Sequence, residues 1–423
     1  MNATLSPDAG ARLMAQADAL AAFTSDAPRL TRTYLSPEHR QAADWLIALM
    51  REAGFDEAGC DALGNIVGRY HGRAGASSPV VMSGSHQDSV RNAGRYDGPF
   101  GILCAIECVR ALSSSRVRLP FTFEVVGFGD EEGVRFGLTL IGSKAMAGAF
   151  DPAWLDKADA DGTTLARALR DFGGDPAAWA SLDRRGRGVV AYLEVHIEQG
   201  PVLLDEGLPV GVVTSIAGAT RARIALTGLA GHAGTVPMHL RRDALAAAAE
   251  MVSLVERRCG EAAHAAAGLV GTVGTLSVAP GAVNVIPQDV AFTIDVRAGD
   301  DATRHDAVRD LRAGFEAIAA RRRVALSWET FYEAAAAPCA PGLQALLARA
   351  VEAEGVPVRR LASGAGHDAM VFPAVCPTAM LFVRCGNGGI SHHPDETMTA
   401  EDARVATAVL LRALQSLPAA DAA

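Results

Sequence analysis

Five side chains that can bind a divalent metal are spread along this chain from residue 86 to residue 392. Each lies in its own Gly- or Pro-marked motif, and imidazole and carboxylate are ligand types that zinc, manganese, cobalt and nickel accept. Ligands scattered in this way indicate a site that the fold assembles, unlike a local metal finger. The pattern favours a metallohydrolase. The residues are His86 in GSHQDS, Asp97 in RYDGPFG, Glu132 in DEEGVRFG, His196 in VHIEQG and His392 in ISHHPDE.

The first half of the chain alternates predicted strands and helices. Ser36-Pro37-Glu38 is typical of a helix start, and Gly54 is typical of the end of that helix. Apolar runs predict buried strands, two of which carry their candidate ligands at the carboxyl end, as in open α/β sheets. The third holds His196 in its last few residues. These strands cover 79–86, 121–132 and 191–198, with a helix near 99–113 between the first two.

A different order of elements is predicted for residues 216–331. The pattern there is βαββαβ, the order of a ferredoxin-like unit. The α/β pattern then resumes with a helix over 341–354, a strand near 378–384 and a closing helix from about residue 400. We therefore expect an α/β catalytic domain, formed by 1–215 and 332–423, that is interrupted by a smaller domain. The predicted elements of the smaller domain are strands over 222–230, 270–279, 289–297 and 324–331 and helices over 241–258 and 301–322.

Composition limits the partners and the compartment. A net charge of −9 and a pI near 5.7 argue against a nucleic-acid partner. No uncharged run approaches the roughly 18–20 apolar residues that span a bilayer. The N-terminal sequence lacks the basic and apolar regions of a signal peptide, and the seven cysteines are dispersed without a CxxC pair. These features predict a cytoplasmic protein with reduced thiols.

Three motifs contain carboxylates suited to hydrolysis. Asp97 could bridge two metals with its two oxygens, and Asp88 is a candidate to orient the imidazole of a ligating His86. If Glu132 binds a metal, Glu131 can act as general base on an activated water and carry the proton to the leaving nitrogen. Each motif alone has a plainer interpretation, such as a loop histidine, a solvated Glu-Glu pair or an Asp-Gly turn. Their joint occurrence in this order favours the catalytic interpretation.

The chain resembles the dinuclear-metal amidase branch of the metallopeptidase superfamily. This branch holds N-carbamoyl-L-amino-acid hydrolases, allantoate amidohydrolases and β-ureidopropionases. The resemblance covers roughly residues 30–415 and rests on the motifs above together with HIEQGPVL, GHAGTVPM, NVIP, DVR and SGAGHDA. Gln87 and Ser89 depart from the common pattern, but neither side chain is a ligand.

The resemblance implies two divalent metal ions, which could be zinc, manganese, cobalt or nickel, with Asp97 as the bridge and Glu131 as the base. Of the two adjacent histidines in ISHHP, the one directly after Ser matches the family ligand, and His393 occupies a variable position. The implied ligands are His86, Asp97 and His196 for one ion, and Asp97, Glu132 and His392 for the other.

The resemblance also implies a set of substrate contacts. His232 and Asn284 would donate hydrogen bonds to the oxyanion, and Arg297 would bind a substrate carboxylate. From spacing alone, His232 could equally be a loop histidine with no role. Gln199 could contact the ureido nitrogens, and the loop SGAGHDA, with Gly364 and His367, would line the pocket.

We therefore expect a homodimeric amidohydrolase of linear ureido acids, such as N-carbamoyl-L-amino acids, allantoate or β-ureidopropionate. Its catalytic domain would have a mixed central sheet flanked by helices, and residues 216–331 would be a lid and dimerisation domain that offers His232 to the partner subunit. The alternative is a dipeptidase or aminoacylase of the same superfamily, which HIEQGP and Arg297 disfavour. A non-catalytic protein of the same fold is a further alternative, but the five ligands and Glu131 are all retained.

Overall fold

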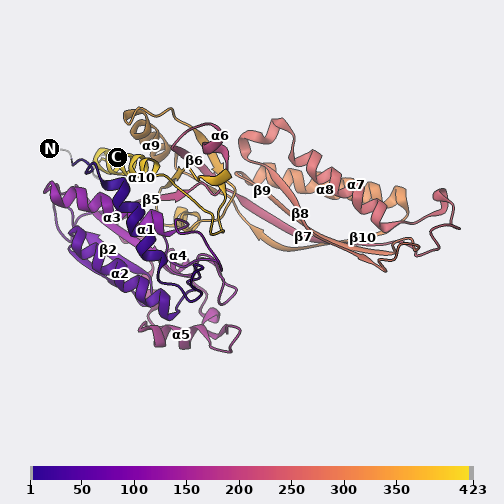
Figure 1. Cartoon of the computed structure of the whole chain (residues 1–423), viewed down its shortest axis with the longest axis horizontal. Coiled ribbons are helices and arrows are strands. Elements are labelled where there is room, and N and C mark those ends of the chain that lie inside the picture. The colour runs from indigo at the N-terminus through magenta and orange to yellow at the C-terminus, as the bar shows by residue number, and fades with distance from the viewer. Residues whose placement is uncertain (1–2, 419–423) are drawn as a thin grey trace. The chain divides into compact units, whose positions relative to one another are not determined.

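The computed structural model describes residues 3–418, with residues 264–266 described by their backbone only (Figure 1). The chain forms two compact units. The first contains the described residues of Met1–Thr214, Cys339–Arg360 and His367–Ala423. The second contains Ser215–Pro338 and also Leu361–Gly366, a short segment that follows much later in the sequence.

The larger sheet is mixed and has the strand order β1-β2-β4-β3-β5-β13-β6-β11, with β12 also paired with β6; its strands β1 to β5 and β13 lie in the first unit. The central strands β4, β3, β5 and β13 run parallel, whereas β2 is antiparallel to β4 and β6 is antiparallel to β13. The predicted mixed sheet is confirmed. The strands are β1 (Glu57–Cys60), β2 (Ile66–Tyr70), β3 (Val80–His86), β4 (Thr122–Phe128), β5 (Val189–Ile197), β6 (Val210–Ile216), β11 (Ala337–Pro338), β12 (Arg360–Ser363) and β13 (Thr378–Val383).

Helices flank this sheet, and α3 is buried along almost its whole length. It packs against β3, β4 and β5 on one side and against α1, α2 and α10 on the other, which explains its largely apolar sequence. At α2 the Ser36 hydroxyl accepts the N–H of His39, and Gly54 ends the helix in the left-handed region with φ 99°. The helices are α1 (Ala9–Ala21), α2 (Pro37–Ala53), α3 (Pro99–Ser114), α4 (Ile141–Met146), α5 (Leu165–Phe172), α6 (Val202–Asp205), α9 (Pro341–Ala353) and α10 (Ala400–Ser416).

The second unit is an antiparallel sheet with the strand order β10-β7-β9-β8. Along the chain its elements are β7 (Gly218–Thr227), α7 (Ala244–Cys259), β8 (Val270–Ala279), β9 (Asp289–Ala298), α8 (Asp301–Arg322) and β10 (Ala325–Ala334). Helices α7 and α8 cover one face of the sheet (Figure 1), where Phe292, Phe315 and Met251 are part of a separate hydrophobic core. Side chains alternate along β7 and β9, so every second residue turns to the opposite face.

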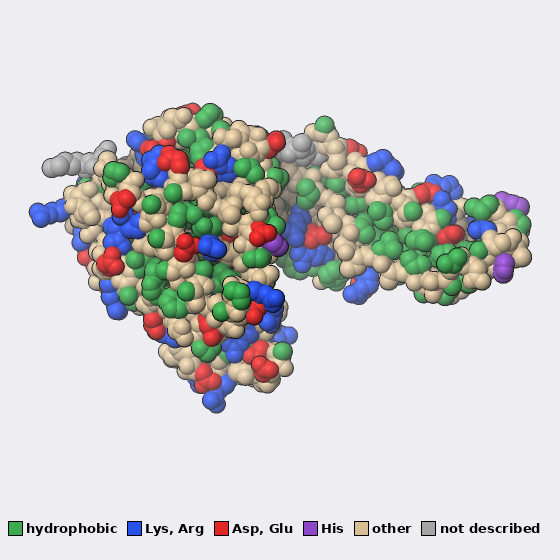
Figure 2. Space-filling model, in the orientation of Figure 1, with side chains coloured by type: hydrophobic (Ala, Val, Ile, Leu, Met, Phe, Trp, Pro, Cys, Tyr) green, Lys and Arg blue, Asp and Glu red, His purple; other side chains and the backbone are tan. Residues whose placement is uncertain are grey.

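The displayed face of the first unit carries charges of both signs (Figure 2), and the described cysteines are free thiols. Acidic and basic side chains are interspersed over the face of the first unit that Figure 2 displays. The seven cysteines, all among the described residues, form no disulfide. Within residues 3–418, no helix combines the length and the apolar character needed to cross a membrane.

Candidate metal centre

The parallel strands of the first unit bring the five predicted metal ligands to one edge of the sheet. His86 is the last residue of β3, His196 is the next-to-last residue of β5, and Glu132 follows β4. His392 lies in the loop after β13, and Asp97 lies two residues before α3. Because parallel strands end at the same edge, loops far apart in sequence meet there.

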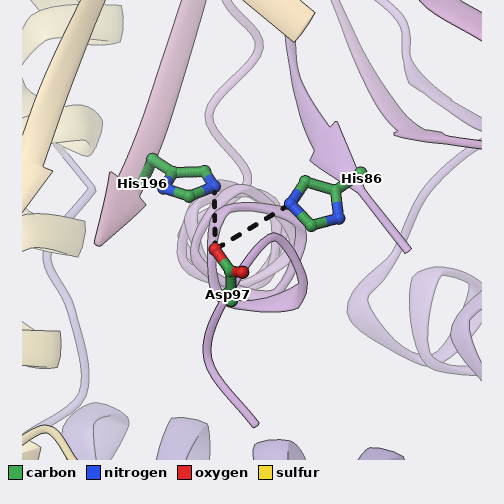
Figure 3. A group of neighbouring side chains, drawn as sticks. All are labelled: His86, Asp97 and His196. Atoms are coloured by element: carbon green, nitrogen blue, oxygen red, sulfur yellow. Dashed lines mark ion pairs between the residues drawn. The ribbon is translucent and has the colours of Figure 1, made fainter. Parts of the chain in front are cut away.

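His86, Asp97 and His196 form the first group of potential ligands. One ligand atom from each lies within 4.8 Å of the other two, and all three residues are buried. The Asp97 Oδ1 atom is 4.0 Å from the Nε2 atom of His86 and 3.5 Å from the Nε2 atom of His196. Figure 3 shows both imidazole rings on the same side of Asp97, each with a ring nitrogen toward its carboxylate. These distances leave room for a cation between the three side chains.

Asp97, Glu132 and His392 form the second group, again with ligand atoms within 4.8 Å of one another. The His392 Nε2 atom is 3.0 Å from Asp97 Oδ2 and 3.6 Å from Glu132 Oε1. Asp97 thus turns Oδ1 toward one group and Oδ2 toward the other. That arrangement suits a carboxylate bridging two cations about 3.5–4 Å apart.

Buried atoms without hydrogen-bond partners test whether these residues fit metal ions. Asp97 Oδ2, Glu132 Oε1 and His196 Nε2 are buried; the last two make no hydrogen bond, and Asp97 Oδ2 has the His392 Nε2 atom 3.0 Å away. Leaving a buried polar atom unsatisfied costs about 1–3 kcal/mol, and more when the group is charged. All three atoms belong to the predicted ligands and face the centre of the two groups, so the donor set fits two divalent cations.

Hydrogen bonds to the other ring nitrogens orient the two buried histidines. The Nδ1 atom of His86 lies 3.0 Å from the carbonyl oxygen of Asp88, and that of His196 lies 2.9 Å from the carbonyl oxygen of Ile197. A hydrogen on Nδ1 leaves Nε2 as the free lone pair that a metal needs. For His86, the nearer acceptor is therefore the backbone of Asp88, because its carboxylate oxygen lies 3.8 Å away.

The carboxylate of Asp88 instead holds the loop that follows β4. Its two oxygens accept the backbone N–H groups of Glu131 and Glu132, at 3.2 and 3.3 Å. Glu131 can also form a ligand group with His86 and Glu132, so its carboxylate lies beside both candidate metal positions. Burial raises the pKa of Glu131 well above its ordinary value, Glu132 adds to that rise, and His86 opposes it. The position of Glu131, beside both ligand groups, is the one that its predicted role as general base requires.

Two of the three histidines around Asp97, His196 and His392, differ in protonation. Burial lowers the pKa of His196 to about 4, so this ring is neutral at pH 7 and can act as a ligand. The hydrogen bond and charge of Asp97 raise the pKa of His392 to about 9. Binding a cation at the second group therefore displaces a proton from His392, which makes metal affinity rise with pH.

Gln199 lies against the carboxylate of Asp97. Its backbone has a positive φ of 56°, and its side-chain nitrogen donates to Asp97 Oδ1 over 2.9 Å. The same nitrogen is 3.4 Å from the hydroxyl of Ser391 and 3.3 Å from His392 Nε2. The amide predicted to contact ureido nitrogens is thus next to the ligands, and its contact with substrate stays a prediction.

Glu396 is a buried residue of the centre that the sequence interpretation missed. Its Oε1 atom accepts the backbone N–H groups of Tyr96 and Asp97, at 2.8 and 3.2 Å, and its Oε2 atom accepts the hydroxyl of Ser391 over 2.8 Å. One side chain therefore joins the loop of the bridging ligand to the loop of His392. Its place at the end of the ISHHPDE motif was the available signal.

A second missed carboxylate, Glu194, lies on β5 two residues before His196, and a ligand atom of each lies within 4.8 Å of the other. It accepts hydrogen bonds from Ser85, Tyr192 and the backbone N–H of Ala369. His367 is buried beside it, with its ring edge-on to that of His196 at a centroid distance of 4.4 Å. Burial lowers the pKa of His367 well below its ordinary value, so this imidazole is neutral.

The predicted substrate contacts of the second unit form two local groups. In the first, Ala233 donates its N–H to the carbonyl of Asn284, so the loops of His232 and Asn284 lie side by side with both residues exposed. The Nδ1 atom of His232 accepts the N–H of Gly234 over 3.1 Å. A neutral His232 then carries its hydrogen on Nε2, which is free to donate to an oxyanion.

In the second group, Arg297 contacts Gly364. Its Nη1 atom donates to the Gly364 carbonyl oxygen over 2.9 Å, and its Nε and Nη2 atoms donate to Asp295. Gly364 thus contacts Arg297 through its carbonyl group, and the predicted place of this loop in the substrate pocket stays a prediction.

Comparison with known proteins gives consistent matches. Residues 82–416 match the model of peptidase family M20/M25/M40. The chain is 41% identical to an N-carbamoyl-L-amino acid amidohydrolase of Geobacillus stearothermophilus, over 92% of this chain and 93% of that protein. It is 40% identical to a probable allantoate deiminase of Oryza sativa subsp. japonica, over 88% of this chain and 81% of that protein. A crystal structure of a hydantoinase/carbamoylase family amidase from Burkholderia multivorans superposes with a TM-score of 0.89 at 35% identity, over 96% of this chain and 97% of that one.

Proposed function

The chain belongs to peptidase family M20/M25/M40, and on that premise we propose that it is an amidohydrolase of linear ureido acids. Its substrates would be compounds such as N-carbamoyl-L-amino acids or allantoate, in line with the relatives that bear those names. The observation that carries the proposal is the geometry of Asp97, which turns one oxygen to each of two ligand groups with Glu131 beside them. That arrangement suits hydrolysis of an unreactive C–N bond.

Two divalent cations would be held by the two ligand groups. Zinc, manganese, cobalt and nickel all accept mixed imidazole and carboxylate ligands. When bound, such cations supply Lewis acidity, which lowers the pKa of water and polarises a carbonyl. The ligands would be His86, Asp97 and His196 for one cation, and Asp97, Glu132 and His392 for the other.

The remaining chemistry falls to the protein's own side chains. Glu131 takes a proton from the attacking water and delivers it to the leaving nitrogen. His232, with its hydrogen on Nε2, and the amide of Asn284 stabilise the oxyanion that forms on the ureido carbonyl. The products are an amine and a carbamate, and the carbamate decays to carbon dioxide and ammonia.

The second unit would supply the substrate contacts. We infer that it is a ferredoxin-like lid and dimerisation domain, because its βαββαβ order and its separate core suit an independent unit. Arg297 would bind the substrate carboxylate, since a guanidinium can donate to both oxygens of such a group. In this account the working enzyme is a homodimer.

Ammonia release from protein reconstituted separately with Mn, Zn, Co or Ni tests the proposal. The substrates are allantoate, β-ureidopropionate, N-carbamoyl-L- and D-amino acids and a dipeptide set, with Glu131→Gln as the blank. We expect ammonia from at least one ureido class with the wild-type protein, and at least a hundredfold less with the blank. Cleavage of dipeptides with no ureido compound hydrolysed would refute the proposal and indicate a peptidase.

A further inference from the structure

A row of charged side chains crosses the face of the second unit's sheet that α7 and α8 leave uncovered. Asp295 on β9 lies directly opposite Arg221 on β7 in the strand register, and Arg297 follows two residues later on the same face. The core side chains of these strands, such as Ile294 and Val296, point the other way. The row is thus fixed by the backbone of two central, paired strands.

Asp295 accepts hydrogen bonds from both arginines. Its Oδ1 atom accepts from Nε of Arg297 over 3.0 Å, and its Oδ2 atom accepts from Nη2 of Arg297 over 3.0 Å and from Nε of Arg221 over 2.9 Å. The contact with Arg297 is therefore bidentate along one side of the guanidinium. The guanidinium of Arg221 also packs against the ring of Tyr332, with 4.8 Å between the guanidinium carbon and the ring centroid.

These hydrogen bonds determine which N–H groups of Arg297 are still available to bind a ligand. A guanidinium carries five N–H bonds. Asp295 takes two of them and the Gly364 carbonyl takes one, on Nη1. One N–H on Nη1 and one on Nη2 are left. A bound carboxylate can therefore reach Arg297 only at its outer end, in one orientation.

The formal charges of the row favour an anion. Two arginines and one aspartate leave a net charge of +1, whereas Arg297 and Asp295 alone would be neutral. Exposed ion pairs usually contribute little to stability, about 0–1 kcal/mol. A bidentate pair on central strands, shared with a second arginine, is better explained by the need to hold one guanidinium in place.

We propose that Asp295 is a positioning residue that holds the guanidinium of Arg297 through Nε and Nη2. The remaining N–H groups on Nη1 and Nη2 then face the substrate carboxylate. Arg221 holds Asp295 in turn and gives the row its net positive charge. The inference rests on the proposed function, because it takes Arg297 to be the carboxylate contact. It predicts that Asp295 and Arg221 affect the binding of an acid but leave the chemical step nearly unchanged.

Kinetics on a matched pair of substrates test this inference. The first substrate is the ureido acid that the metal-loaded wild-type protein hydrolyses fastest, and the second is the same compound with its carboxylate converted to a carboxamide. The variants are Asp295→Asn, Arg221→Gln and Arg297→Ala, with the double variant of Asp295→Asn and Arg297→Ala. Asp289→Asn is the control, because Asp289 lies on the same strand and face as Asp295 and its carboxylate accepts a hydrogen bond from the side chain of Gln288, a neutral residue.

We expect Asp295→Asn to raise KM for the acid about tenfold, with kcat changed less than twofold, because Asn presents a donor to Nη2 and turns the guanidinium. Arg221→Gln should raise KM for the acid about threefold even if Asp295→Asn folds poorly. The carboxamide kinetics and those of Asp289→Asn should stay within twofold of wild type. In the Arg297→Ala background, Asp295→Asn should add no further rise in KM.

Four results would overturn the inference. Equal losses on acid and carboxamide, or an additive loss in the Arg297→Ala background, would make Asp295 a structural residue only. Unchanged KM in Arg297→Ala would remove the carboxylate contact itself while leaving ureido hydrolysis intact. If the wild-type protein hydrolysed no ureido acid, the proposed function would fail and this inference with it.

Discussion

Replacing Gly98 by Ala should disturb the first ligand group more than any change of similar size nearby. Gly98 follows the bridging Asp97 and has φ 79° and ψ −66°, which L residues rarely adopt. A Cβ atom there would lie 2.4, 2.5 and 2.6 Å from Cε1, Nδ1 and Cγ of His86. Since real carbon contacts begin near 3.5 Å, the imidazole would have to move by about 1 Å.

Two costs follow from this geometry. The backbone conformation costs about 1–3 kcal/mol for a residue with a Cβ, and the overpacking costs about 1–3 kcal/mol more. The expected loss in the free energy of unfolding of Gly98→Ala is therefore about 2–6 kcal/mol. Because His86 would be displaced by about 1 Å, metal affinity and turnover should each fall about a hundredfold.

Gly162→Ala is the matched control, since Gly162 has φ 81° but no atom within 4 Å of the added Cβ. It should lose about 1–3 kcal/mol of stability through backbone strain and bind metal normally. Urea unfolding of the metal-free proteins gives the stabilities, and calorimetric titration with manganese gives the affinities. Wild-type metal affinity in Gly98→Ala would refute the assignment of His86 as a ligand held against this glycine.

Three further predictions concern other parts of the first unit and the assembly. Glu396→Ala should lower metal affinity about 10–100-fold in the same titration, because it frees the loops of Asp97 and His392, whereas an affinity equal to wild type would show that Glu396 orients neither. Burial lowers the pKa of His39 to about 3 in the folded chain. At a pH below 6.5, the ordinary pKa of histidine, the unfolded chain therefore takes up a proton at this residue that the folded chain does not. Stability should therefore fall by about 1.4 kcal/mol per pH unit between pH 6.5 and 5 relative to His39→Asn, and parallel urea-unfolding curves for the two proteins would contradict this. Mixing inactive Glu131→Gln with inactive His232→Ala should restore part of the ammonia release if His232 serves the partner subunit, and no recovery after subunit exchange would show that it acts within its own chain.

The elements with strong local signals could be predicted from the sequence. The helix α2 begins at Pro37 and ends before Gly54, as the cap residues indicate, because capping depends on neighbours a few residues away. The parallel strands were recognisable as apolar runs, since they are buried on both faces. The strands β1, β2 and β6 and the helix α1 were missed, because short or weakly periodic segments depend on tertiary partners.

The ligands were likewise easier to predict than the groups that orient them. The motifs indicated that His86, Asp97 and His392 could meet, and the structure brings their ligand atoms together. The sequence interpretation made Asp88 a candidate to orient His86, and in the structure the backbone carbonyl oxygen of Asp88 lies nearer to His86 than its carboxylate does. Glu396 lies 299 positions from Asp97 in sequence, and only the folded chain shows their hydrogen bond. Backbone acceptors and long-range contacts leave no spacing in the sequence to detect.

Anomalous diffraction from crystals of the manganese-loaded protein tests the central claim most directly. We predict two anomalous peaks about 3.5–4 Å apart, with Asp97 bound to both. One should lie between His86 and His196, and the other between Glu132 and His392. A single peak, or a peak between Glu194 and His367 in place of these, would contradict the account.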